Sequence, residues 1–389
     1  MKFLLELLGM TNQCNLKCSY CDWQKERYFD LTEEHIKTAK NNLHRIKELI
    51  DNDYKDIGLI QYSGGEPLLY PEILDDVLDI FSDKWLRINT NGVMLSDYIL
   101  DKAKKHGKVY FAVSLDGSTM RANHPRVNGN ETILNTILNN INRIVEKKVP
   151  LMILCTLNKE NIEEFPGFIE YLEENYYSAI EEGMLVMPTH CVTSYGKDNG
   201  APTEFQIGDF RQYLSENRNK SKLISNILLH YENLECYLVN KQRSYNCNIY
   251  DWTISMHFRR NDIIDSGKFL GFGCGMRGVH ELGYFDVNSD KDMGEFKLKV
   301  DHYDKCRKLD YYNSEEQVSE HNDLNENCEE KCFPDWVYFD LLLLGKVSIE
   351  EAANWFVVFK DPNIQSLVKK YQEEKDILKW GLGDQELPI

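Results

Sequence analysis

The stretch TNQCNLKCSYC (residues 11–21) places three cysteines, Cys14, Cys18 and Cys21, in a C-x3-C-x2-C spacing. Thiolates are the usual protein ligands of iron–sulfur clusters, and short cysteine spacings of this kind are typical of them. A four-iron cluster held by three thiolates leaves one iron without a protein ligand, and an open metal position can bind a small molecule. The stretch therefore predicts a reactive cluster with one open iron.

Two other uses of these cysteines are less consistent with the sequence. A zinc site normally has four ligands, and the nearest histidines, His35 and His44, lie in a stretch with helical periodicity. A disulfide is unfavourable because the chain has 11 cysteines and shows no signal peptide, which indicates a reducing compartment. The open cluster is the interpretation that we carry forward.

Length and charge limit the remaining possibilities. A chain of 389 residues, 42% of them hydrophobic, can bury a large core, in two domains or in one large domain with an appendage. Its net charge of −18, without a basic stripe, argues against a nucleic-acid partner. The apolar residues 1–10 are too few to span a membrane, and no later stretch is long enough. We expect a soluble cytoplasmic protein without a membrane partner.

Apolar runs and helical patterns alternate along the first half of the chain. The expected strands lie at 3–10, 57–62, 85–90, 109–114, 150–156 and 183–188. The expected helices lie at 32–51, from 71 onward, and at 95–106, 131–148 and 161–175. In the helix after Asn130, an apolar stripe at Ile133, Ile137, Ile141 and Ile144 predicts core packing. Six strand–helix units predict an α/β fold with a parallel sheet.

The polar motifs of this half follow the predicted strands, at the end where parallel barrels gather their function. The cysteine loop follows the first strand, Gly64–Pro67 the second, Asn91 the third, and Ser114 with Asp116 the fourth. Glycines allow a backbone to approach a ligand closely, so residues 65–67 can present carbonyl groups, and Glu66 a carboxylate, to an ammonium group. A plain turn is the alternative for the two glycines taken alone.

The cysteine loop, YSGGEP (62–67), NTNG (89–92), VSLDG (113–117) and RVNG (126–129), in this order, resemble the motifs of the radical S-adenosylmethionine (SAM) superfamily. The resemblance implies a partial (β/α)6 barrel of the TIM type. It also implies a [4Fe–4S] cluster on Cys14, Cys18 and Cys21 whose open iron chelates the amino and carboxylate groups of SAM. An electron from the cluster then cleaves SAM to a 5′-deoxyadenosyl radical.

The same resemblance implies which residues contact SAM. The segment Gly64–Pro67 would receive the amino group, Ser114 and Arg126 the carboxylate, and the backbone around Tyr20 the adenine. A surface salt bridge is the alternative for Arg126, and a turn-capping role for Asp116. The full predicted SAM-binding set is Tyr20, Ser63, Gly64, Gly65, Glu66, Pro67, Asn91, Ser114, Asp116 and Arg126.

Two further cysteines lie near the expected site. Cys155 falls inside a predicted buried strand and is interpreted as a small core residue. Cys191, next to His190, follows the sixth strand and could donate a hydrogen atom to a radical. A buried, inert thiol is the alternative for Cys191.

Six cysteines recur between residues 236 and 332, where this chain's own cysteine frequency would give about three, so a second metal site is expected. The segments GFGCGMRG (271–278) and CEEKCFPDW (328–336) resemble the SPASM and twitch extensions, which hold auxiliary [4Fe–4S] clusters. The chain has too few cysteines for the full two-cluster SPASM pattern. One cluster on Cys274, Cys306, Cys328 and Cys332 is expected, with Cys247 in reserve for Cys306 and zinc as the alternative metal.

These observations give three expected regions: a radical SAM barrel at 1–215, an auxiliary iron–sulfur domain at 216–345 and a helical tail at 346–389. The resemblance implies an enzyme that abstracts a hydrogen atom from a peptide or protein side chain, supplied with electrons by flavodoxin or ferredoxin. A sugar or other small metabolite is the alternative substrate. No leader-peptide-binding domain is expected before the cysteine loop. A non-catalytic iron–sulfur electron carrier is the alternative outside the enzymes.

Overall fold

The structure, a computed structural model, describes residues 4–8, 13–21, 31–190, 200–228, 253–257, 268–272, 281–286, 342, 348–355 and 357–373. The predicted auxiliary ligands Cys274, Cys306, Cys328 and Cys332, together with Cys191 and Cys247, lie outside these residues. The second metal site and the hydrogen-donor role of Cys191 therefore stay predictions. Among the described helices, none combines the length and the apolar character that crossing a bilayer requires.

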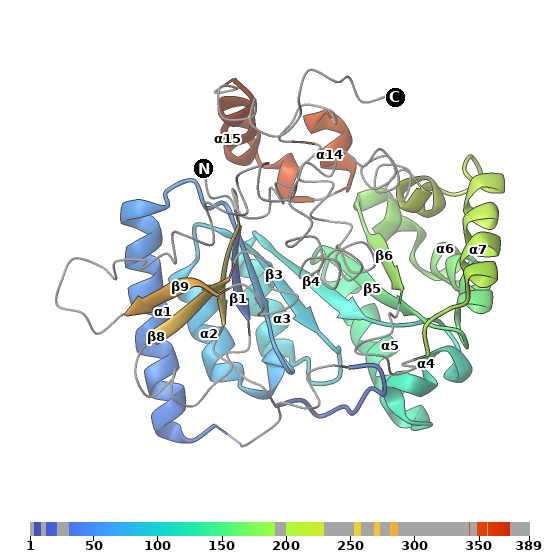
Figure 1. Cartoon of the computed structure of the whole chain (residues 1–389), viewed down its shortest axis with the longest axis horizontal. Coiled ribbons are helices and arrows are strands. Elements are labelled where there is room, and N and C mark those ends of the chain that lie inside the picture. Colours follow the sequence, from blue (N-terminus) through green and yellow to red (C-terminus); the bar gives the residue numbers. More distant parts are fainter. Residues whose placement is uncertain are drawn as a thin grey trace, which may run out of the picture.

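A single sheet organises the described residues (Figure 1). Its strands β1 to β6 lie side by side in sequence order, and each is parallel to the next. Their bounds are Leu4–Leu8, Leu59–Ser63, Trp85–Thr90, Val109–Ser114, Leu151–Leu157 and Leu185–His190. This order confirms the parallel α/β sheet predicted from the alternation of strands and helices.

Helices connect these strands at nearly the expected places. The connecting helices are α1 (Glu33–Asp53), α2 (Pro71–Ile80), α3 (Asp97–His106), α4 (Met120–Val127), α5 (Glu131–Glu146) and α6 (Phe165–Glu182), and α7 (Glu204–Glu216) follows β6. Thr32 begins α1 with a capping box, in which its hydroxyl accepts from the His35 backbone N–H at 3.2 Å. The sequence did not predict α4, because Pro125 lies inside it and proline interrupts a helical pattern.

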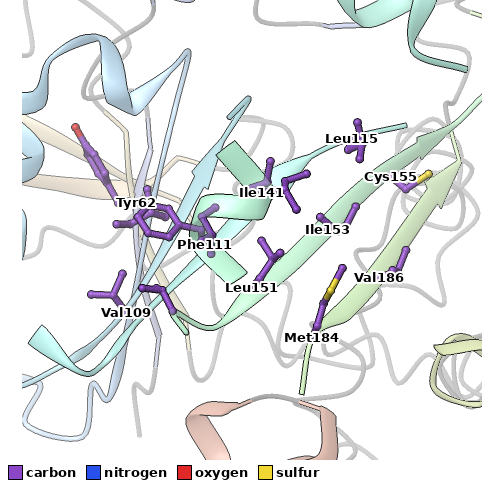
Figure 2. Close-up of a cluster of buried hydrophobic side chains, with 14 of the residues drawn as sticks. Tyr62, Val109, Phe111, Leu115, Ile141, Leu151, Ile153, Cys155, Met184 and Val186 are labelled. Carbon is purple, nitrogen blue, oxygen red and sulfur yellow. The ribbon is translucent and has the colours of Figure 1, made fainter. Parts of the chain in front are cut away.

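The hydrophobic core lies between the strands and these helices. Ile137, Ile141 and Ile144 of α5 are fully buried, and Ile133 packs partly buried against them, which confirms the apolar stripe. Figure 2 shows Ile141 among side chains of the neighbouring strands, including Phe111 of β4. Each such side chain contributes roughly 1.5–3 kcal/mol through burial, so the stripe fixes α5 against the sheet.

The sheet continues beyond residue 215, where the sequence suggested that the barrel pattern stops. Strand β7 (Thr253–His257) pairs in parallel with β1, and β8 (Lys268–Phe272) and β9 (Glu281–Asp286) extend the edge in antiparallel pairing. Three short strands from the expected auxiliary region thus join the sheet that carries the cysteine loop. Strands of five or six residues without intervening helical patterns give little sequence signal.

The C-terminal elements cover the opposite end of the sheet from the cysteine loop. They comprise α14 (Ile349–Trp355), the 3₁₀ turn η5 (Val357–Lys360) and α15 (Pro362–Glu373), with α14 and α15 at the top of Figure 1. Asp361 accepts a hydrogen bond from the Trp85 indole N–H at 3.0 Å and lies 3.2 Å from the Lys108 ammonium. Trp85 begins β3 and Lys108 precedes β4, so these elements anchor to the amino ends of the strands.

Candidate functional site

The cysteine loop, described over residues 13–21, follows β1 and carries three thiols that form no disulfide. Cys18 is only 8% exposed, whereas Cys14 and Cys21 are partly exposed. The pKa of the Cys18 thiol is raised to about 11, chiefly by burial; Arg126 opposes the shift, and Cys21, Asp116 and Cys14 contribute to it. The three sulfurs are therefore near enough to interact electrostatically, and their thiolates would need a cationic centre beside them.

Asn91, directly after β3, connects the loop to the sheet. Its side-chain amide donates to Asn15 Oδ1 at 2.7 Å and approaches Cys14 Sγ at 3.6 Å. Its side-chain oxygen accepts from the Val93 backbone N–H at 3.0 Å, which orients the amide toward the loop. The structure thus places the predicted site residue Asn91 against the first cysteine.

Glu66 of the YSGGEP segment is completely buried and joins three parts of the site. Its carboxylate accepts hydrogen bonds from the Thr90 hydroxyl at 2.6 Å and the Asn91 backbone N–H at 2.7 Å. It also accepts from the Leu68 N–H at 3.0 Å, and the Glu66 N–H donates to the Gln13 carbonyl at 2.7 Å. Both carboxylate oxygens are thus engaged within the protein, so Glu66 fixes the glycine segment to β3 and to the cysteine loop.

The stability of the protein should depend on the ionisation of Glu66. Burial raises the pKa of this carboxyl group from 4.5 to about 7, while the hydrogen bonds from Thr90, Asn91 and Leu68 oppose the shift. Between these two pH values the unfolded chain has released the proton and the folded chain retains it, so stability falls as the pH rises. The loss should reach roughly 3 kcal/mol at pH 7 and then stay constant.

Glu66→Gln removes this titration. Denaturant unfolding of the wild-type protein and the variant from pH 4.5 to pH 8 measures how the free energy of unfolding depends on pH. The wild-type protein should lose stability relative to the variant between pH 4.5 and 7. The Thr90 hydroxyl can reverse to accept from the protonated carboxyl, because hydroxyl groups both donate and accept. Two stability curves that run parallel over this range would contradict the expectation.

Asp116 and Arg126 form a buried ion pair beyond the end of β4. The guanidinium donates to both carboxylate oxygens, at 3.1 Å from Nε and 2.8 Å from Nη2, and the Asp116 and Arg126 side chains are 0% and 6% exposed. Tyr20 Oη donates to Asp116 Oδ2 at 2.5 Å, and the Thr156 backbone N–H donates to Oδ1 at 3.0 Å. The predicted residues Tyr20, Asp116 and Arg126 are thus brought together, with the salt bridge of Arg126 buried instead of on the surface.

The remaining predicted residues lie where the strand order puts them. Ser63 and Ser114 end β2 and β4, and both are partly buried, as are Gly64 and Gly65. Their contacts with SAM stay predictions. Cys155 in β5 is completely buried within the hydrophobic cluster, which confirms its interpretation as a core residue (Figure 2).

A row of polar strand residues that the sequence did not predict crosses the sheet. Gln61, Arg87 and Tyr110 are register neighbours on β2, β3 and β4, and all three are buried. They alternate with residues of the hydrophobic cluster, such as Ile60 and Tyr62 on either side of Gln61. Arg87 Nε donates to Asn89 Oδ1 at 2.9 Å. The sequence did contain a signal for them, because polar residues at every second position of an apolar strand lie on the opposite face of the sheet from the hydrophobic cluster.

Gly92, the last residue of NTNG, has a backbone conformation that favours glycine, with φ of 76°. A Cβ added there would lie 2.8 Å from Val113 Cγ1. Gly107 has the same φ of 76°, but an added Cβ would meet nothing within 4 Å. Gly92→Ala should therefore destabilise the protein more than Gly107→Ala, by roughly 1–3 kcal/mol in denaturant unfolding. Equal losses would show that the shared backbone strain, and not the contact with Val113, decides the cost.

Comparison with known proteins agrees with this arrangement. The family model described as the radical SAM superfamily matches residues 8–172, from the end of β1 into α6. A relative from Methanosarcina barkeri, Fe-coproporphyrin III synthase, is 30% identical over 170 residues, which are 43% of this chain and 40% of that protein. The chain thus spans less than half the length of this curated relative.

Solved structures share the fold at low sequence identity. The structure of native anSMEcpe with bound AdoMet and the Cp18Cys peptide is similar, with a TM-score of 0.55 and 17% identity over 79% of this chain and 84% of that one. SuiB of Streptococcus suis bound to S-adenosylmethionine has a TM-score of 0.53 and 14% identity, over 75% and 64% of the two chains. Both likenesses are to structures that contain bound SAM, and at this level of identity they show a shared fold.

Proposed function

We propose, from the premise that residues 8–172 form a radical SAM superfamily domain, that this protein reductively cleaves SAM and uses the 5′-deoxyadenosyl radical to abstract a hydrogen atom from a substrate. The observation that carries the proposal is the loop of three thiols at the carboxyl end of β1, held by Asn91 and Asp116 at the ends of β3 and β4. An electron carrier would need neither this sheet nor the buried Glu66 that fixes the glycine segment.

The donor set fits a [4Fe–4S] cluster better than a single metal ion. Among the described residues, no three His, Cys, Asp or Glu side chains converge as a single ion requires. Cys14, Cys18 and Cys21 nevertheless interact electrostatically, and thiolates that each bind a different iron of one cluster lie further apart than ligands of one ion. When bound, the cluster would supply the electron for SAM cleavage, and flavodoxin or ferredoxin is the expected donor.

The chain's own residues would orient SAM and the cysteine loop. Gly64 and Gly65 would bring backbone carbonyls to the amino group, with Glu66 holding that segment in place from below. Ser114, at the end of β4, would bind the carboxylate. Arg126 already pairs with Asp116. It would therefore act on the SAM carboxylate only through its charge, and the opposite charge of Asp116 weakens that attraction.

A peptide or protein side chain is the substrate class that we favour. The structure of anSMEcpe contains both bound AdoMet and a bound peptide, which supports this choice through likeness of fold. An auxiliary cluster on Cys274, Cys306, Cys328 and Cys332, within residues 216–345, would take up the electron left on the substrate. A small metabolite is the alternative, which the name of the Methanosarcina relative favours. Both substrates are compatible with a cytoplasmic enzyme.

The test begins with anaerobic reconstitution of the full chain with iron and sulfide, followed by reduction and addition of SAM. Chromatography should then show 5′-deoxyadenosine that depends on both the reductant and SAM. No deoxyadenosine from protein whose cluster is intact by spectroscopy would favour the electron carrier. Added peptides and small metabolites should differ in how far they accelerate this formation, which separates the two substrate classes.

A further inference from the structure

Tyr20 lies between the second and third cysteines and reaches across the site to β4. Its hydroxyl donates to Asp116 Oδ2 at 2.5 Å, a contact between residues 96 positions apart in sequence. A hydrogen bond to a charged acceptor is stronger than one between neutral groups. The Cys18–Cys21 half of the loop is therefore attached to the carboxyl end of β4 by a side chain that is not itself a ligand.

The acceptor of this bond cannot reorient freely. The Asp116 carboxylate accepts hydrogen bonds from two nitrogens of Arg126 and from the backbone N–H of Thr156, near the end of β5. The backbone N–H of Asp116 also donates to Asn123 Oδ1 at 3.0 Å. Moving the carboxylate toward another partner would leave Arg126 buried without its counter-ion, which is strongly unfavourable.

A second contact attaches the same half of the loop. The Ser19 backbone N–H donates to the Pro125 carbonyl of α4 at 2.8 Å. The guanidinium carbon of Arg126 lies 5.7 Å from the centroid of the Tyr20 ring, within the range of a cation–π contact. Asn91 and the Glu66 backbone N–H hold the Cys14 end separately, so the two halves of the loop are attached to different parts of the sheet.

We propose that Tyr20 is a positioning residue whose hydroxyl, held by the Asp116–Arg126 pair, fixes Cys18 and Cys21 before any cluster binds. Ligands that are already ordered lose less conformational freedom when the metal centre assembles. Its use in cluster assembly rests on the function proposed above. The contact itself belongs to the apoprotein and can be tested there.

The test is Tyr20→Phe, which keeps the ring over Arg126 and removes the hydroxyl alone. In apoprotein, peptide-resolved alkylation should modify Cys18 and Cys21 roughly tenfold faster than in wild type, because a bond to a charged group is lost. Cys14, held by Asn91, should change less. Cys155, fully buried in β5, serves as the internal reference for opening of the whole fold.

The matched control is Tyr98→Phe, which removes an exposed hydrogen bond of 2.6 Å from Tyr98 of α3 to Asp75 of α2. It should leave the alkylation rates of Cys14, Cys18 and Cys21, each divided by the rate of Cys155, unchanged. The ratio of the Cys18 rate to the Cys155 rate decides the outcome. A ratio in Tyr20→Phe equal to wild type overturns the proposal, whether neither rate changes or both rise together.

A second readout uses the reconstituted protein. Tyr20→Phe should assemble the cluster more slowly, followed by absorbance during anaerobic reconstitution, and its reduced cluster should show an altered electron paramagnetic resonance spectrum. If wild-type protein assembles no cluster while the alkylation ratio still rises in the variant, the proposed function fails and the positioning role stands. If the cluster forms and the ratio does not rise, the positioning role fails alone.

Discussion

Cys18→Ala is expected to lower the formation of 5′-deoxyadenosine by roughly a thousandfold or more, because ligands of one centre act as a unit. Cys18 is the most buried of the three loop thiols, at 8% exposure. The two remaining thiolates, Cys14 and Cys21, would not retain the cluster when it is reduced. Iron content and deoxyadenosine, measured on the same reconstituted sample, check the expectation.

Cys155→Ala is the matched control, since it makes the same chemical change at a completely buried thiol in β5. It should preserve iron content and deoxyadenosine formation and cost about 1 kcal/mol of stability through the small cavity. Cys332→Ala should spare SAM cleavage at least partly, because we assign that residue to the auxiliary cluster. Equal losses from Cys18→Ala and Cys332→Ala would contradict this division of roles.

Asp116→Ala should lower the free energy of unfolding of the apoprotein by roughly 3–5 kcal/mol, the usual cost of leaving a buried charge unpaired. Arg126 is 6% exposed and directs two nitrogens at this carboxylate. The substitution also removes the acceptor for Tyr20 and Thr156. Denaturant unfolding of the apoprotein measures the loss without any contribution from a cluster.

Asp97→Ala provides the comparison, because Arg143 Nη2 lies 2.8 Å from Asp97 Oδ1, the same separation as in the buried pair. The Asp97 side chain is 75% exposed, and water screens such pairs, so its loss should be close to the error of the measurement. Both proteins lose an Asp–Arg ion pair, so the difference between them reflects burial together with the hydrogen bonds from Tyr20 and Thr156 that only Asp116 accepts. Similar losses in the two variants would show that the buried pair is no more important than a surface one.

Much of the fold could be predicted because its signals are local. The strands β3 and β4 have the bounds that their apolar runs indicate, and the stripe of α5 faces the core as its spacing requires. The helix α4 and the strand β7 were missed, because each is short and depends on its neighbours. The Pro125 carbonyl of α4, for example, is engaged by Ser19 from a distant loop.

The sequence by itself determined the three-cysteine loop, the order of the parallel strands and the end of the sheet at which the site forms. Spacing and periodicity record such features, since they arise between residues close in the chain. Only the tertiary structure decided that Glu66 holds β2 to β3, that Asp116 pairs with Arg126 in the interior, and that Tyr20 joins this pair. Those roles depend on burial and on partners far apart in sequence, because the interactions of a carboxylate are set by the charged and hydrogen-bonding groups that the fold places next to it.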